Sequence, residues 1–547
     1  MIFNVKQVTS LEKVRPHEKC TAKEVSSKTV MKGEYFAYQV VLRAECKTDI
    51  KVSMDSDISE YVTLYAVKNN ILDFPVYDWG DDDYITKEPC LMPDILIPIE
   101  EENMILRAAN ESVTLWVKVR LPRDINAGEY DIKLRFEAWS ESETAEDECA
   151  MTVSVTENVL PARKLIFTQW FHVDCIADVH GVPIYSEEHW TLIEKYMSLA
   201  SELGINMILT PVITPPLDTK VGTTRPCTQL LGIEKVGEKY YFDFSLLRRW
   251  LDVCKRCGMK YIEVSHLFSQ WGIKHSANVR VRENGVESYM FGWHTDAKSP
   301  EYKAFLQQMI PALTDVLGEE GYLENTYFHI SDEPSGKHLD AYKYAHDLIV
   351  PLIGKCRTLD AISDVTFYEN GLISTPATSI AHMESFLDHN VENQWAYYCC
   401  GEAHLVSNRF MAMASYRTRI IGLQMYKYGI KGFLQWGYNF YYSQLSVKKI
   451  DPYRTTSADK AFPSGDPFSV YPHGDGAVPS LRAEVFREAI NDISVCMALE
   501  ELVGREAVIR MIDEAAGMNV TFKEYPRNAE YIPALIEKME RMIAEVK

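Results

Sequence analysis

Thr326-Tyr327-Phe328-His329-Ile330-Ser331-Asp332-Glu333-Pro334-Ser335 combines a short apolar strand with two adjacent carboxylates. The first six residues favour a β-strand, and Pro334 prevents that strand from continuing. Two like charges side by side raise the pKa of one of them, which suits an enzyme that keeps one carboxyl protonated and its neighbour ionised. The alternative is a helix start, with Ser331 as N-cap and Asp332 and Glu333 in the first turn. The rest of the chain decides between these two interpretations.

Strand and helix patterns alternate around this stretch. Eight strands are predicted at 165–173, 206–212, 260–267, 326–331, 356–362, 377–382, 394–399 and 432–438. Helical patterns lie between most of them, for example at 244–257, 302–317 and 416–428, and a helix at 481–502 follows the last strand. This order is typical of a (β/α)8 TIM barrel, in which the chemistry lies at the carboxyl ends of the strands. A doubly wound open sheet is the alternative, but no Gly-rich phosphate loop follows the first strand.

The chain before this barrel has a different hydrophobic period. Short alternating runs at 35–42, 112–119, 126–134 and 152–155 are separated by turn residues, which predicts a β-sandwich. A chain of 547 residues is too long for a single core. We therefore expect a β-sandwich domain at 1–162, a catalytic barrel at 163–504, and a small α/β extension at 505–547 packed on the barrel. The extension ends in an amphipathic helix at 532–546.

Composition limits the partners and the compartment. A formal net charge of −21 argues against nucleic acid and anionic membrane surfaces, because both require a basic face. The first six residues lack the pattern of a secretory signal, and no stretch reaches transmembrane length. The twelve cysteines are scattered, which is typical of buried thiols rather than of a disulfide framework. We expect a cytoplasmic protein without membrane insertion; the sequence specifies no oligomeric state.

Polar and aromatic residues gather where the predicted strands end. They are Trp170 and His172 after the first strand, Glu263, His266 and Trp271 after the third, Asp332 and Glu333 after the fourth, Asp364 after the fifth, Trp395 and Tyr397 after the seventh, and Trp436 and Asn439 after the eighth. Strand ends that only lead into turns would carry small residues, so these large polar and aromatic residues predict a pocket. No GxSxG, HExxH, P-loop or GxGxxG motif occurs, so neither a metal nor a cofactor is predicted. Carboxylates together with aromatic rings favour glycoside chemistry.

Two glycosidase mechanisms compete. A double-displacement enzyme needs a carboxylate nucleophile about 5–5.5 Å from the acid. The late strands offer little for this role: residues 435–439 contain no carboxylate, and Glu402 lies beyond its strand's end. Substrate-assisted hydrolysis needs two neighbouring carboxylates instead. One stabilises a 2-acetamido group as it attacks the anomeric carbon, and the other protonates the leaving oxygen. Asp332 and Glu333 supply such a pair.

The sequence resembles glycoside hydrolase family 123, the β-N-acetylgalactosaminidases. The resemblance rests on the Asp-Glu pair after the fourth strand and on the segments 92–98, 168–172, 360–364, 395–400 and 432–437. It implies that Asp332 stabilises the acetamido group and that Glu333 is the general acid/base. It also implies an oligosaccharide or glycoconjugate substrate with terminal β-linked N-acetylhexosamine, with galactosamine favoured over glucosamine. A non-catalytic carbohydrate-binding protein is the alternative outside enzymology.

The other strand-tip residues are predicted to bind the sugar. The members of this set are the tryptophans Trp170, Trp395 and Trp436 as walls of the site, His172, Glu263, His266 and Asp364 as partners of hydroxyls, Tyr397 as a partner of the acetamido oxygen, and Arg417 and Asn439 as further hydroxyl ligands.

Overall fold

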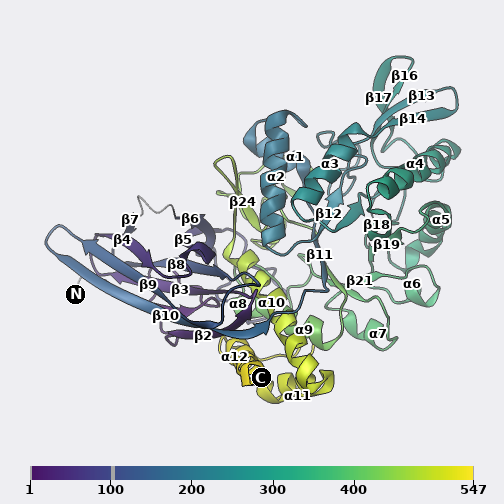
Figure 1. Cartoon of the computed structure of the whole chain (residues 1–547). Coiled ribbons are helices and arrows are strands. Elements are labelled where there is room, and N and C mark those ends of the chain that lie inside the picture. The colour runs from purple at the N-terminus through teal and green to yellow at the C-terminus, as the bar shows by residue number, and fades with distance from the viewer. Residues whose placement is uncertain (1–2, 100–104, 271, 546–547) are drawn as a thin grey trace.

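The computed structural model describes residues 3–99, 105–270 and 272–545 (Figure 1). Its N-terminal region is rich in sheet. One five-stranded sheet has the order β1 (Phe3–Thr9), β3 (Tyr35–Ala44), β8 (Glu111–Arg120), β5 (Val62–Leu72), β6 (Cys90–Pro98), and the other has the order β2 (Ser27–Lys32), β10 (Thr144–Val159), β9 (Gly128–Trp139), β4 (Thr48–Asp55), β7 (Ile105–Ala108). Apolar side chains from both sheets form one buried cluster. The strands predicted in this region overlap β3, β8, β9 and β10.

A nearly closed parallel barrel follows. Its nine strands are β11 (Ile166–Gln169), β12 (Met207–Thr210), β15 (Tyr261–Val264), β18 (Thr326–Phe328), β19 (Arg357–Thr358), β20 (Asp360–Ala361), β21 (Pro376–Ser379), β22 (Trp395–Tyr397) and β23 (Gly432–Gln435). The order around the sheet is β19-β18-β15-β12-β11-β23-β22-β21-β20. Only Leu359 separates the two edge strands along the chain, so the ends of the sheet meet.

All eight predicted barrel strands overlap strands of this sheet. The count differs because the strand predicted at 356–362 is split: residues 357–358 pair with β18, and residues 360–361 pair with β21. The observed sheet is therefore a nearly closed barrel of nine parallel strands rather than the regular (β/α)8 barrel that the sequence predicts.

Helices follow the strands along the chain. They are α1 (Val173–His180), α2 (Glu187–Glu202), α3 (Ser245–Arg256), α4 (Pro300–Glu319), α5 (Leu339–Ile349), α6 (Thr366–Glu369), α7 (Met383–Leu387), α8 (Ser415–Arg419), α9 (Ile421–Lys427) and α10 (Leu481–Val503). The helices predicted at 244–257, 302–317 and 481–502 are confirmed, and the one predicted at 416–428 is divided into α8 and α9. Within the described residues, no helix is long and apolar enough to cross a membrane.

Two small sheets were not predicted. One, with the order β14 (Lys239–Asp243), β13 (Gly232–Val236), β16 (Val279–Glu283), β17 (Val286–Phe291), projects beyond the barrel at the upper right of Figure 1. The other pairs β24 (Val470–His473) with β25 (Gly476–Pro479).

The C-terminal extension differs from its prediction. Its described residues form the helices α11 (Arg505–Ala516) and α12 (Tyr531–Glu545) and no strand, so the expected α/β extension is wrong. Between these helices the backbone carbonyls of Val520 and Thr521 accept hydrogen bonds from the side chains of Tyr428 and Gln424. In a β-strand these carbonyls would bond to the backbone of a partner strand instead. The predicted helix at 532–546 corresponds to α12, except that Val546 lies outside the described residues.

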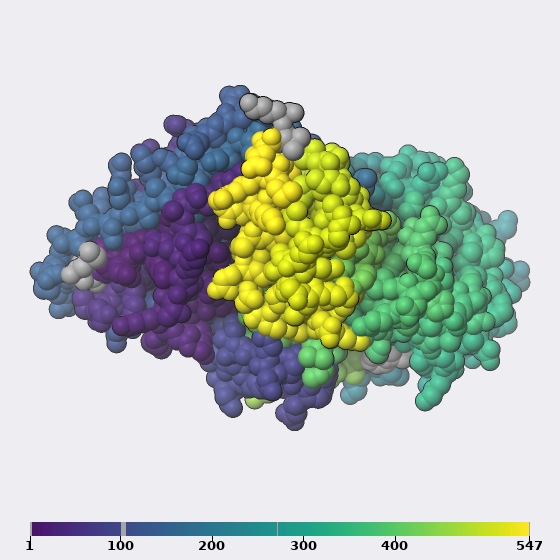
Figure 2. Space-filling view, turned by 90° about the horizontal axis from the view of Figure 1, so that it is seen from below, coloured from purple at the N-terminus to yellow at the C-terminus, as the bar shows by residue number. Residues whose placement is uncertain are grey.

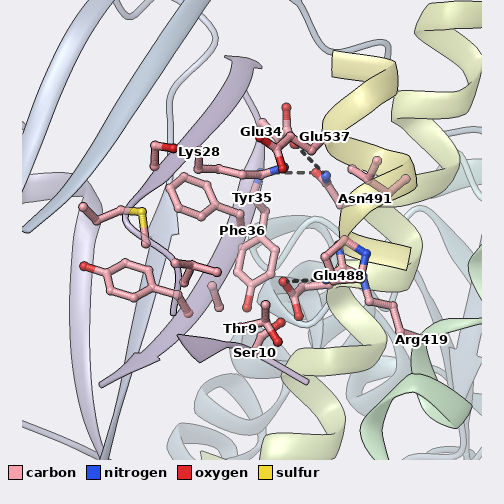
Figure 3. A pocket seen from close by; sticks show the side chains of 17 residues that line it. Thr9, Ser10, Lys28, Glu34, Tyr35, Phe36, Arg419, Glu488, Asn491 and Glu537 are labelled. Atoms are coloured by element: carbon pink, nitrogen blue, oxygen red, sulfur yellow. Dashed lines mark hydrogen bonds and ion pairs between the residues drawn. The ribbon is translucent and has the colours of Figure 1, made fainter. Parts of the chain in front are cut away.

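Helix α12 packs on α10 and also on strands β2 and β10 of the N-terminal region. Figure 2 shows the C-terminal residues seated between the N-terminal region and the rest of the chain. A small pocket lined by both polar and apolar side chains lies at this junction (Figure 3). There Asn491 of α10 donates to Glu34 at 3.2 Å and accepts from the amide of Tyr35 at 3.2 Å. The sheet-rich region and the barrel are therefore joined by buried polar contacts.

Candidate active site

The Asp332–Glu333 pair lies in the loop at the carboxyl end of β18. Asp332 is buried, with 8% of its surface exposed, whereas Glu333 is exposed. Glu333 adopts a left-handed φ of +41°, and its amide donates to the carbonyl of Ala361 (3.1 Å). Neighbouring side chains on a strand point to opposite faces, so this turn allows both carboxylates to line one pocket. No helix begins at Ser331, since a short 3-10 helix begins only at Gly336 and the α-helix α5 at Leu339; the helix-start alternative is wrong.

A pocket of about 130 Å³ surrounds the pair. Its walls come from the segments at the carboxyl ends of β11, β12, β15, β18, β22 and β23; besides the pair they include Trp170, Asp218, Gln270, Tyr397, Tyr398, Cys399, Cys400, Trp436, Leu445 and Phe462. Tyr397 donates its hydroxyl to Glu333 Oε1 at 2.9 Å and so fixes the direction of that carboxylate. The pocket has the carboxylates, the aromatic walls and the opening to solvent that a sugar site requires.

The pocket contains three carboxyl groups. Burial raises the pKa of Asp332 well above its ordinary value, and the charges of Glu333 and Asp218 raise it further. Burial also raises the pKa of Asp218 to about 6, although Arg225 opposes this shift. Carboxylates close to one another repel, so these three carboxyl groups together tend to retain one proton.

His329 lies between two buried carboxylates near Asp332. Its Nε2 is 2.6 Å from Glu263 Oε1, and its Nδ1 is 3.4 Å from Asp360 Oδ1. Burial alone would lower the pKa of His329, but the hydrogen bonds and charges of Asp360 and Glu263 raise it to about 9. The imidazole of His266 stacks on it, with ring centroids 3.9 Å apart, and burial together with the charge of His329 lowers the pKa of His266. A protonated His329 favours the ionised form of Asp332.

We expect His329 to make stability depend on pH. Its pKa in the folded protein, about 9, lies above the value of about 6.5 in the unfolded chain, so its contribution is complete below pH 6.5 and is lost as the pH rises through 9. The free energy of unfolding should fall over this range by on the order of 3 kcal/mol more than in His329→Gln. Urea titrations at several pH values measure this difference. The exposed His17→Gln is the control, and equal slopes in wild type and His329→Gln would contradict the assignment.

Some predicted site residues do line the pocket. Trp170, Tyr397 and Trp436 surround it together with the carboxylate pair. The indole of Trp170 donates to Glu263 at 2.7 Å, and that of Trp436 donates to Asp466 at 2.9 Å. Hydrogen bonds to buried carboxylates therefore lock both rings in place. Glu263 is one of these carboxylates: it orients Trp170 and His329 from below the pocket and does not line it.

His172 and Asn439, both predicted to bind sugar hydroxyls, are hydrogen-bonded to each other instead. The Asn439 side chain accepts from the backbone amide of His172 (2.8 Å) and donates to its carbonyl (3.0 Å). The His172 ring contacts the Trp436 carbonyl and the Arg225 guanidinium, and burial with the nearby Arg225 lowers its pKa to about 3. Neither residue lines the pocket, and groups distant in the sequence already satisfy their polar atoms.

The remaining predictions fall elsewhere. Trp395 begins β22 and is 1% exposed, so it fills the barrel near the other end of the strand and is not a wall of the site. Arg417, on α8, is held by Asp81 and does not line the pocket. Asp364 accepts from the amide and hydroxyl of Thr366 at the start of α6, and His266 lies under Trp170, so neither lines the pocket. Trp271 lies outside the described residues.

Sequence reasoning missed several pocket residues. Asp218 stands in a loop eight residues beyond the end of β12, and Phe462 stands far beyond the end of β23. Cys399 and Cys400 line the pocket as partly exposed thiols, although the sequence suggests buried ones. Asp218 and Phe462 have no sequence signal beyond a position on the carboxyl side of a barrel strand, which many loop residues share. Cys399 and Cys400 lie in the segment 395–400 that carries the family resemblance, but no local pattern marks them as pocket residues.

Comparisons with known proteins agree with this geometry. The family described as Glycoside hydrolase 123, catalytic domain, matches residues 170–499. The structure of a family 123 glycoside hydrolase from Clostridium perfringens, solved in a study of glycolipid glycan hydrolysis, has a TM-score of 0.76 and 15% identity, covering 100% of this chain and 98% of that chain. A β-glucuronidase from Parabacteroides merdae has a TM-score of only 0.32 and 11% identity over 84% of this chain and 50% of that chain. No curated protein matches the sequence.

Proposed function

Because the chain belongs to glycoside hydrolase family 123, we propose that it removes terminal β-linked N-acetylhexosamine, with galactosamine preferred, by substrate-assisted catalysis. Membership of this family makes the chain an enzyme that hydrolyses glycosides. The observation that carries the finer proposal is the joint placement of Asp332 and Glu333 in one pocket, the first buried and the second exposed. We also propose that β19 and β20 act as one strand of an eight-stranded barrel.

Each carboxyl then has one role. Glu333, at the solvent side, donates a proton to the glycosidic oxygen while the acetamido oxygen of the substrate attacks the anomeric carbon and forms an oxazoline. Asp332 accepts a hydrogen bond from the acetamido N–H and stabilises the positive charge that develops on that group. The Glu333 carboxylate next removes a proton from water, which opens the oxazoline with overall retention.

Double displacement has weaker support. The rival nucleophile Glu402 accepts hydrogen bonds from the Ser379 hydroxyl and from the Cys399 amide (2.7 Å), and it does not line the pocket. Burial raises the pKa of Glu402, which further disfavours a free, ionised nucleophile. A substrate acetamido group would supply the nucleophile without any movement of Glu402.

An aryl-glycoside panel tests the proposal. We expect release from aryl β-N-acetylgalactosaminide, slower release from the glucosaminide, and no comparable release from aryl β-galactoside, which lacks the acetamido nucleophile. An N-acetylhexosamine thiazoline, which mimics the oxazoline, should inhibit competitively. A fluorosugar ester trapped on Glu402 would instead establish double displacement. Sugar binding without any turnover would favour a carbohydrate-binding protein.

A further inference from the structure

The segment 73–89, between β5 and β6 of the N-terminal region, contacts the barrel loops that form the pocket. Tyr77 donates its hydroxyl to the carbonyl of Ala461 at 3.0 Å, next to the pocket residue Phe462. Burial raises the pKa of Tyr77, and the adjoining thiol of Cys400, which lines the pocket, is the next cause. A residue of the N-terminal region thus forms the layer directly behind one pocket wall.

Trp79 lies on the ring of Tyr77. Its indole stacks on the Tyr77 ring, with centroids 5.3 Å apart and planes inclined by 14°. With 53% of its surface exposed, Trp79 is among the most exposed large hydrophobic residues of the chain. A tryptophan held flat and open to solvent leaves a broad apolar face uncovered, which is a feature of binding surfaces.

The barrel holds this segment firmly. Asp81 pairs with the buried Arg417, at 2.8 and 3.0 Å, and Tyr84 donates to the carbonyl of Ala403 at 2.7 Å. Before Trp79 in the sequence, Asp73 accepts from the hydroxyls of four residues of the barrel loops, Thr455, Thr456, Ser457 and Ser464. Arg417, expected to bind a sugar hydroxyl, instead fixes the segment that carries Trp79. A ring held in advance loses little conformational entropy when it binds a ligand.

The position of Trp79 relates it to the leaving group. Glu333 must face the glycosidic oxygen, so the sugar beyond that oxygen emerges on the exposed side of Glu333. Tyr397 donates to Glu333, and Cys399 and Cys400, which follow it in the sequence, also line the pocket. The thiol of Cys400 in turn adjoins the ring of Tyr77. Successive contacts therefore connect the acid Glu333 with Tyr77, on whose ring Trp79 stacks.

We propose that Trp79 is a platform on which the sugar next to the cleaved residue stacks, so that the N-terminal region selects the aglycone. The inference rests on the proposed function. The ligand is a neutral pyranose of an oligosaccharide, whose C–H face packs on the indole as an apolar surface does. A methyl β-glycoside has no ring beyond the cleaved bond, whereas an aryl aglycone could itself stack on the indole, so the platform discriminates oligosaccharides from methyl glycosides.

Trp79→Ala should lower the ratio of kcat/KM for an N-acetylgalactosaminyl-β-hexose disaccharide to that for the methyl β-N-acetylgalactosaminide by roughly tenfold. Trp79→Phe should restore most of this ratio because it keeps an aromatic face. Trp139→Ala is the matched control, since Trp139 ends β9, pairs with Thr144 of β10 and Asp49 of β4 and does not line the pocket, and its ratio should equal that of wild type. An unchanged ratio in Trp79→Ala would overturn the platform.

Binding separates this inference from the proposed function. In the Glu333→Gln background, calorimetry with the same disaccharide should show about tenfold weaker binding when Trp79 is replaced by alanine. If wild type cleaved no N-acetylhexosaminide, the proposed function would fail, while Trp79-dependent binding of the disaccharide would still support the platform. Binding that is the same with and without Trp79 would refute the platform even if the enzyme is active.

Discussion

Replacing Glu333 by glutamine is expected to lower kcat/KM for a disaccharide substrate by roughly 10³–10⁴-fold. A sugar alkoxide leaves poorly unless it is protonated, and glutamine has no acidic proton. An aryl substrate with an acidic phenol leaves without such help, so its rate of glycosidic cleavage should fall much less. The measurement is a series of aryl leaving groups of increasing pKa, in which Glu333→Gln should show a steeper dependence of rate on that pKa than wild type.

Glu402→Gln is the matched control for this prediction. It is the same change at a buried carboxylate near the pocket, held by Ser379 and the Cys399 amide. The substrate-assisted mechanism expects Glu402→Gln to retain turnover, whereas double displacement expects it to lose turnover for every leaving group. A leaving-group dependence in Glu333→Gln identical to that of wild type would remove Glu333 from the role of general acid.

Asp332→Asn is expected to lower turnover by roughly 10²–10³-fold for good and poor leaving groups alike. The acetamido group becomes positively charged in both cases, and a neutral amide stabilises that charge less than a carboxylate does. A thiazoline inhibitor should also bind more weakly, since it carries the same charge. Loss confined to poor leaving groups would instead assign Asp332 a role in proton donation.

The pH profile provides a second readout for Asp332. Burial and the neighbouring carboxylates raise its pKa, and catalysis requires its ionised form, so kcat/KM should rise with pH through a value above the ordinary pKa of aspartate. Asp332→Asn should lose this acidic limb because asparagine does not titrate. Exposed Asp340→Asn serves as the control and should keep the wild-type profile.

Two of the tip residues show why hydrogen-bonding capacity is an incomplete guide to a site. His172 and Asn439 have the polar atoms that a sugar hydroxyl requires, and both follow barrel strands. The fold brings them together, and they satisfy each other's backbone and side-chain groups. Whether a polar side chain is free to bind a ligand depends on partners hundreds of residues away, and a local pattern does not contain them.

The sequence by itself determined the order of strands and helices in the barrel, because side-chain alternation and helical period are local consequences of backbone geometry. It also placed the Asp332–Glu333 pair after the fourth strand, since a proline ends that strand at a known position. Only the tertiary structure decided which other residues join the pair. Asp218, Cys400 and the Trp79 segment arrive from loops of three different regions, and the contacts that hold them, such as the one between Arg417 and Asp81, span up to several hundred residues. Long-range packing sets those positions, and hydrophobic period carries no information about it.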